Sequence, residues 1–177
     1  LFRSAGIIQQ FFNECLWPAL DFLIVDLPPG TGDIQLTLVQ TVPVTGAVIV
    51  TTPQEVAVAD AIKAMNMFRL PSVNVPILGV VENMSWFTPK ELPDNKYFLF
   101  GQGGGKQLAK ISESILLGQV PIVQGIRESG DEGRPAILRD DDAMTVDALL
   151  TVAKNTARQV AVRNEMLEPT RIVNVQR

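Results

Sequence analysis

The sequence predicts an α/β fold in which a doubly wound parallel sheet carries helices on its faces. Short apolar runs, without the polar alternation of a half-exposed strand, recur along the chain and are typical of strands buried on both faces of a sheet. Segments with a helical apolar period separate them, which implies right-handed crossovers and a parallel sheet. With 177 residues and 46% hydrophobic content, the chain has enough apolar side chains for the core of one domain.

Four strands are expected, and polar or turn-forming residues follow them. The first is "DFLIVD", an apolar run between two acids, and the others lie in "GAVIVTTP", "VPILGVVEN" and "SILLGQVPI". These strands correspond to residues 21–26, 46–53, 75–83 and part of 114–122. Active sites in such sheets lie at the carboxyl ends of the strands, where Asp26, Asn83 and the Val120–Pro121 turn stand.

Helices are expected between and around these strands. Their apolar periods indicate helices at residues 4–17, 33–40, 56–68 and 144–166. Asp33 is a suitable N-cap for the second of them. The last helix shows one apolar face, made of Val146, Leu149, Leu150, Ala153, Ala157 and Val160.

Composition excludes several classes of protein. The net charge is −4, from 15 Lys and Arg against 19 Asp and Glu, and no basic block is present, so nucleic acid is not an expected partner. No apolar run approaches the roughly 20 residues that span a bilayer, and we expect no membrane partner. A single cysteine, Cys15, suits a reducing, cytoplasmic compartment. The absence of histidine removes a histidine triad and imidazole metal sites.

The stretch "LIVDLPPGTGD" places an acid at the tip of an apolar strand and two prolines after it. A nucleotide site needs such an acid, because its carboxylate holds the water shell of a magnesium ion between the terminal phosphates. Pro28 and Pro29 limit the loop's conformations, and Gly30 lets a backbone N–H approach a γ-phosphate. The alternative is that Asp26 only caps the turn after its strand.

Five blocks of the sequence, in this order, resemble the Mrp family of P-loop ATPases, the iron–sulfur cluster carrier group related to the partitioning and septum-placement ATPases. The resemblance extends at least from Trp17 to Pro135, and "DLPPGTGD" is specific to the family. The blocks are "DFLIVDLPPGTGDIQLTLVQ", "TGAVIVTTPQEVAVADAIKAMNMF", "VPILGVVENMSWF", "FGQGGGKQLA" and "LGQVPI".

The resemblance implies a P-loop NTPase sheet, ATP and Mg as cofactors, and a homodimer with apoprotein clients. It implies that Asp26 is the catalytic Walker B aspartate, which binds Mg through water, and that Pro28 and Gly30 belong to the switch sensing the γ-phosphate. It further implies that Asn83 hydrogen-bonds the adenine edge and that the turn at Pro121 lies along the adenine through backbone groups. The alternatives are a capping or turn asparagine and an ordinary strand-to-loop proline.

The first departure from the family is the missing phosphate loop. The family's Walker A loop and its lysine belong to an upstream strand, loop and helix, so we expect residues 1–177 to be the C-terminal portion of a single P-loop ATPase domain, without ATPase activity alone. "GQGGGKQ" is no substitute, because the pattern requires a glycine where Phe100 stands and a Ser or Thr where Gln107 stands. Gly103 to Gly105 are expected to form a tight turn into a helix.

The second departure concerns the iron–sulfur cluster. The family usually carries Cys-x-x-Cys after its "ENMS" block, and one pair from each subunit holds a bridging cluster. No cysteine stands between Asn83 and Gly101, so we expect no iron–sulfur cluster at the usual site of this chain. Cys15 is expected in the core face of the first helix. The aromatic residues Trp86, Phe87, Tyr97 and Phe98 are expected to form an apolar contact surface or a locally packed excursion.

Three functions remain open from the sequence. The first is an ATPase that carries iron–sulfur clusters and transfers them to apoproteins. The second is a positioning ATPase that acts by nucleotide-dependent dimerisation, although the last helix lacks the short basic amphipathic form of membrane-targeting relatives. The third is a scaffold that has lost cluster binding and acts through protein contacts.

Overall fold

The computed structural model of the chain describes residues 2–89, 91–138 and 143–172. Its centre is a parallel sheet in the order β1-β2-β3. β1 is Ala47–Thr51, β2 is Ile77–Glu82 and β3 is Leu116–Gln119. These apolar strands alternate with helices and have helices on both faces, which confirms the expected α/β architecture.

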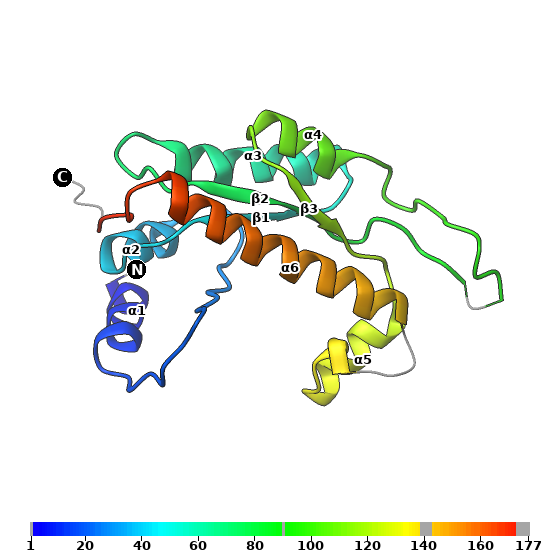
Figure 1. Ribbon diagram of the computed structural model, residues 1–177, viewed down its shortest axis with the longest axis horizontal. Helices are drawn as coiled ribbons and strands as arrows, with labels where there is room; N and C mark the ends of the chain where they lie inside the picture. Colours follow the sequence, from blue (N-terminus) through cyan, green and yellow to red (C-terminus); the bar gives the residue numbers. More distant parts are fainter. Residues whose placement is uncertain (1, 90, 139–142, 173–177) are drawn as a thin grey trace.

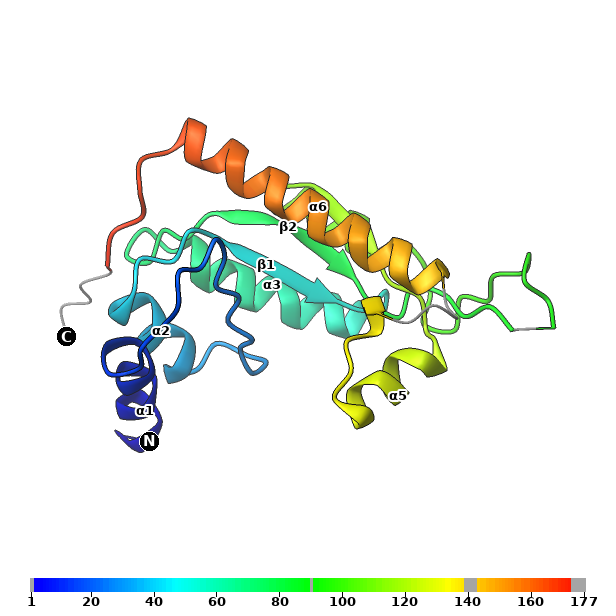
Figure 2. The same ribbon diagram turned by 60° about the horizontal axis from the view of Figure 1, so that its bottom comes forward.

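The helices form a layer on each face of the sheet (Figure 1). The crossover helices α3 (Glu55–Arg69) and α4 (Gly104–Ile111) lie on one face, and α6 (Ala143–Met166) lies along the other, as Figure 2 shows. Two successive crossovers on one face follow from right-handed connections between strands that are added in one direction. The sheet is therefore covered on both sides, as the apolar strands predict.

The core has two parts because successive residues of a strand point to opposite faces. Val80 is fully buried against α3 and α4, together with Met65 of α3 and Leu108 of α4. The next residue, Val81, faces α6 and packs with Leu117 of β3 and Val152 of α6. Most of the buried apolar side chains belong to the α3 and α4 side.

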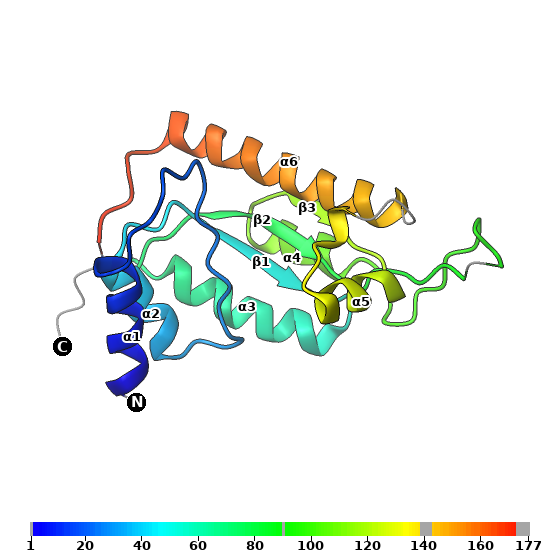
Figure 3. The same ribbon diagram turned by 90° about the horizontal axis from the view of Figure 1, so that it is seen from below.

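The remaining elements lie at the two ends of the sheet (Figure 3). Helices α1 (Phe2–Asn13) and α2 (Asp33–Thr41) lie toward the ends where the strands begin. Helix α5 (Gln124–Glu132) and the 3-10 turn η1 (Ala136–Leu138), neither expected from the sequence, lie toward the carboxyl ends. No helix in the described part of the chain is long and apolar enough to cross a membrane.

The prediction of a first strand at residues 21–26 is wrong. Residues 21–26 are irregular and exposed, and the side chains of Phe22 and Ile24 are 54% and 88% exposed. A strand requires a neighbour for its backbone N–H and C=O groups, and in the described part of the chain β1 pairs only with β2. Among the residues that the structure describes, the apolar run is therefore paired with no strand of the sheet and is covered by no layer.

Three local expectations are also corrected. The N-terminal helix ends at Asn13, and Cys15 lies beyond it and is exposed, not in the core. The N-cap of α2 is Gly32, and Asp33 is its first residue, where a carboxylate still favours the positive end of the helix dipole. The packed face of α6 includes the buried polar residues Thr145 and Arg163, whereas Ala153 and Ala157 are exposed.

Truncation of the core on the α4 side will test this packing. Leu108→Ala removes a fully buried side chain and is expected to lower the free energy of unfolding by about 2–5 kcal/mol, through lost burial and the cavity left behind. Ile111→Ala, on the same helix with a side chain 39% exposed, is the matched control and is expected to cost well under half as much. Urea denaturation measures both, and equal costs would contradict this core.

Candidate functional site

The loop after residues 21–26 is anchored at its start and open to solvent beyond. Leu27 is half-buried and packs against the core on the α3 and α4 side. Asp26, next to it, is exposed, and its carboxylate makes no hydrogen bond or ion pair within the described residues. An exposed carboxylate with free oxygens is the type of ligand that holds a hydrated magnesium ion.

Gln35, a residue that the sequence analysis did not select, holds this loop to helix α2. It is 3% exposed, and its Nε2 donates to the carbonyl oxygens of Pro28 at 2.8 Å and of Gly30 at 3.1 Å. The available signal was its position, because it follows the N-cap residue Gly32 by three residues, where a glutamine side chain commonly reaches back over the helix start.

Gly30 is the point at which the loop turns. Its φ is +100°, a left-handed conformation that glycine adopts without the strain a side chain would bring. An added Cβ would meet no atom within 4 Å. Glycine is therefore favoured at this position by the backbone conformation and not by a lack of space.

Asn83 follows β2 directly and is half-buried. Its backbone N–H donates to the carbonyl of Thr51 at 2.7 Å, and its Oδ1 accepts from the N–H of Met84 at 2.9 Å. Met84 has a φ of +54°, so the side chain caps a tight turn, as in the alternative interpretation of this residue. Its Nδ2 makes no hydrogen bond among the described residues, and remains a free donor.

The Val120–Pro121 turn lies beside the turn that follows β2. Val120 donates its N–H to the carbonyl of Glu82 at 2.9 Å, and Ser85 donates to the carbonyl of Val120 at 3.0 Å. Pro121 is among the residues with relative exposure below 2%, so its ring is covered. The structure thus brings Asn83 and Pro121 together at the carboxyl ends of β2 and β3.

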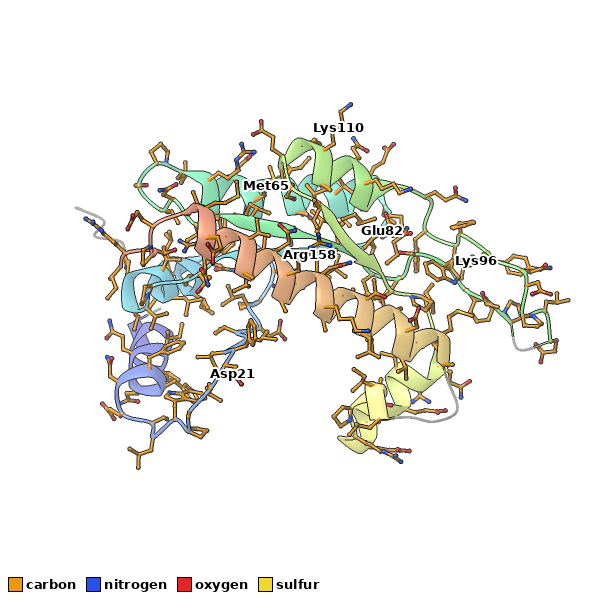
Figure 4. All side chains as sticks on the ribbon, viewed as in Figure 1. Asp21, Met65, Glu82, Lys96, Lys110 and Arg158 are labelled. Carbon is orange, nitrogen blue, oxygen red and sulfur yellow. The ribbon has the colours of Figure 1, made fainter. Side chains whose placement is uncertain are left out.

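The loop that contains Asp26, Pro28 and Gly30 does not join this pair. No hydrogen bond within the described residues links the two groups. Figure 4 shows Asp21, which precedes the loop, away from Glu82 at the carboxyl ends. The cause is the missing strand, because an acid that ends a strand reaches the common edge of the sheet only when that strand has paired.

Glu82, the last residue of β2, is the most buried acid of the described chain at 1% exposure. Its Oε2 accepts the N–H of Gly105 at 2.6 Å, and its Oε1 accepts Nε2 of Gln119 at 2.6 Å. The partial positive charge at the start of α4 offsets the buried charge. The sequence signal was an acid that ends an otherwise apolar strand.

The contact between Glu82 and Gly105 shows how the segment "GQGGGKQ" is used in the fold. Gly103 is the N-cap of α4 with a φ of +81°, which confirms the tight turn into a helix. The N–H of Gly105 already binds the carboxylate of Glu82, and a Cβ on Gly105 would lie 2.6 Å from that of Glu82. The acid of Glu82 occupies the helix start, so the segment joins α4 to the end of β2.

The segment from Trp86 to Phe98 projects from the carboxyl ends of the strands (Figures 1 and 3). Phe87 and Tyr97 exchange two backbone hydrogen bonds of 2.8 Å, and Nζ of Lys96 lies 4.1 Å from the centre of the Trp86 ring. Tyr97 and Phe98 are each 42% exposed. The described part of this segment is thus a locally paired excursion that also presents aromatic surface.

The described residues offer no cluster site of the usual type. They contain no group of three or more cysteine or carboxylate side chains placed to hold a metal ion. Cys15 is exposed and follows helix α1, which Figure 1 shows at the other end of the molecule from the projecting segment. The departure from the family pattern thus lies in the sequence, which has no cysteine between Asn83 and Gly101.

Comparison with known proteins identifies the family. A family model described as ParA, the NUBPL iron-transfer P-loop NTPase, matches residues 3–157. The chain belongs to this family. The α/β fold of the P-loop NTPase type that the sequence predicts is thereby confirmed.

Two curated relatives are similar over most of the chain. An iron-sulfur cluster carrier protein of Synechocystis sp. is 52% identical over 157 residues, which are 89% of this chain and 44% of that protein. One of Escherichia coli (strain K12) is 42% identical over 164 residues, 93% of this chain and 44% of that protein. The chain thus spans less than half the length of these relatives.

Solved structures agree with the fold. A nucleotide-binding protein from Archaeoglobus fulgidus in complex with ADP is 36% identical with a TM-score of 0.68, over 82% of this chain and 59% of that one. The cell division ATPase MinD of Pyrococcus furiosus is 20% identical with a TM-score of 0.59, over 88% and 57%. At that identity the second likeness concerns the fold alone.

Replacement of Glu82 will test the joint at the strand ends. Glu82→Gln keeps the size of the side chain but turns one acceptor into a donor that faces Gly105 or Gln119. We expect the free energy of unfolding to fall by about 1–3 kcal/mol. Glu165→Gln, an exposed position of α6, is the control and should change it by less than about 0.5 kcal/mol. Equal urea midpoints for the two variants would contradict the role of Glu82.

Proposed function

We propose that residues 1–177 are the C-terminal portion of a single P-loop ATPase domain, and that the whole protein binds and hydrolyses ATP to carry iron–sulfur clusters to apoproteins. The observation that carries this proposal is the "DLPPGTGD" loop, held by Gln35 beside a free Asp26 carboxylate, in a chain of an iron-transfer NTPase family. The carrier names of the relatives at 42% and 52% identity support the cargo.

Asp26 is the proposed magnesium-positioning group. Its carboxylate is exposed and unpaired in the described chain, so it accepts hydrogen bonds from ion-bound water without breaking an internal contact. The ion itself neutralises charge on the terminal phosphates when it is bound. What this chain supplies is the acid, the stiff Pro28–Pro29 step after it, and Gly30.

Asn83 and the turn at Pro121 form the proposed adenine contact. Nδ2 of Asn83 is a free donor for a ring nitrogen of a purine, while its Oδ1 stays on Met84. Pro121 is covered, so the contact is assigned to backbone groups around it. The two turns are held together by the bonds between Glu82, Val120 and Ser85.

Residues 21–26 complete the proposed site when they join the sheet. Phe22 and Ile24 are exposed, β1 is an edge strand of the sheet in the described part of the chain, and its residue Val50 is 59% exposed. Pairing of this segment in the whole protein removes both apolar surfaces from water, which is favourable. It also moves Asp26 to the carboxyl edge that Asn83 and Pro121 already share.

The cluster in this role is cargo and not a resident cofactor of the chain. Two copies of this chain supply two cysteine sulfurs in all, fewer than the four thiolates of the usual iron–sulfur sites. We therefore assign the Trp86–Phe98 segment to contact with a second subunit or an apoprotein client. A scaffold without its own cluster is the second candidate, and the exposed, lone Cys15 favours it.

A change at Asp26 will test the catalytic part of the proposal. In the whole protein, Asp26→Asn is expected to lower magnesium-dependent ATP turnover at least about a hundredfold, because loss of a magnesium-positioning group costs several kcal/mol of transition-state stabilisation. Asp21→Asn, an exposed acid of the same segment, is the control and should keep turnover within about twofold. Turnover near wild type in Asp26→Asn would remove this residue from the metal site.

Reconstitution will test the assignment of the cluster. Anaerobic incubation of this 177-residue chain with iron and sulfide is expected to leave no stable cluster, because its single cysteine cannot supply the usual thiolate set. Iron and acid-labile sulfide per chain, and the visible spectrum after desalting, measure the outcome. A stoichiometric cluster that is lost in Cys15→Ser would restore direct cluster binding by this chain.

A further inference from the structure

Both N–H groups of the Gln35 side-chain amide donate to the same loop. Gln35 extends from the first turn of α2, is 3% exposed, and donates from Nε2 to the carbonyls of Pro28 and Gly30. A glutamine amide has two N–H bonds, and both are used on loop carbonyls. The two contacts bracket Pro29, so the side chain holds the loop on either side of its stiffest residue.

The contact with Gly30 fixes the direction of the next peptide group. No peptide bond of the described chain is cis, and in a trans peptide the C=O and the following N–H point in opposite directions. With the carbonyl of Gly30 turned toward the buried amide of Gln35, the N–H of Thr31 is turned away from it. Thr31 is exposed, and this N–H has no acceptor within the described residues.

The acceptor end of Gln35 has no partner. Oε1 is buried and makes no hydrogen bond in the described chain. An exchange of the amide N and O would leave two carbonyl oxygens facing Oε1, so the assignment follows from the contacts. Oε1 lies 3.7 Å from the position that a Cβ on Gly32 would take. A glutamine three residues after an N-cap commonly accepts the N-cap N–H, so the N–H of Gly32 is the donor that would satisfy it.

We propose that Gln35 is a positioning residue for recognition of the terminal phosphate of a nucleoside triphosphate. It holds the carbonyl of Gly30 inward and thereby presents the N–H of Thr31 outward, to a phosphate oxygen. Binding of that oxygen draws the loop so that the N–H of Gly32 reaches Oε1 and the unpaired acceptor is satisfied. This role rests on the proposed nucleotide site and concerns the third phosphate specifically.

The test compares two nucleotides in the whole protein. Affinities for a non-hydrolysable ATP analogue and for ADP, each with magnesium, are measured for the wild type, Gln35→Glu and Gln35→Met. Gln35→Glu replaces the amide donor by an oxygen, and Gln35→Met removes polarity at similar length. Gln40→Glu is the matched control, because Gln40 is an exposed residue of the same helix.

Both Gln35 variants are expected to bind the triphosphate analogue about tenfold or more weakly, with ADP affinity within about twofold of wild type and Gln40→Glu unchanged. Equal loss for both nucleotides, or no loss for either, would mean that Gln35 supports the fold only. Wild type that binds neither nucleotide would overturn the proposed function itself, and this role with it.

A measurement on the wild type covers the case in which the variants do not fold. The backbone amide NMR signals of Thr31 and Gly32 are expected to shift with the triphosphate analogue and to remain in place with ADP. Identical spectra with the two nucleotides would overturn the proposal even without a variant.

Discussion

The arrangement at the carboxyl ends of the sheet depends on one buried carboxylate, that of Glu82. It joins the last residue of β2 to the start of α4 through Gly105 and to the end of β3 through Gln119. A buried acid is stable only with such partners, and here they are a helix start and a neutral amide. Asn83 and the Val120–Pro121 turn follow directly on these strands, and the backbone bonds of Val120 with Glu82 and Ser85 hold the two turns together beside this side chain.

The two halves of the candidate site differ in how far this chain completes them. The half at Asn83 and Pro121, proposed to contact adenine, needs only β2 and β3, which are paired and covered on both faces. The half around Asp26 needs a strand at residues 21–26, and β1 offers a free edge without holding that strand. Gln35 nevertheless fixes the loop locally, so the conformation of this loop is a property of α2 and the loop rather than of the sheet.

Sequence reasoning succeeded where local pattern and tertiary environment agree. The strands at β1, β2 and β3 and the helices α2, α3, α4 and α6 follow from apolar period and turn residues. It failed for residues 21–26. An apolar run indicates that a segment is stable when buried, but it does not show whether a neighbouring strand is present to pair with it. Glu82 and Gln35 were missed because a buried polar residue is recognised by its partners, and Gly105 and Pro28 lie 23 and 7 residues away from them.

The exposed stretch from Phe22 to Val25 also affects how copies of the isolated chain can contact one another. It presents apolar side chains and unpaired backbone groups, and the free edge of β1 presents the complementary surface on the same molecule. Two different surfaces that fit one another form head-to-tail contacts, which do not close by symmetry and extend into filaments. A contact between copies that joins these two surfaces is head-to-tail, and its extent depends on the concentration of the chain.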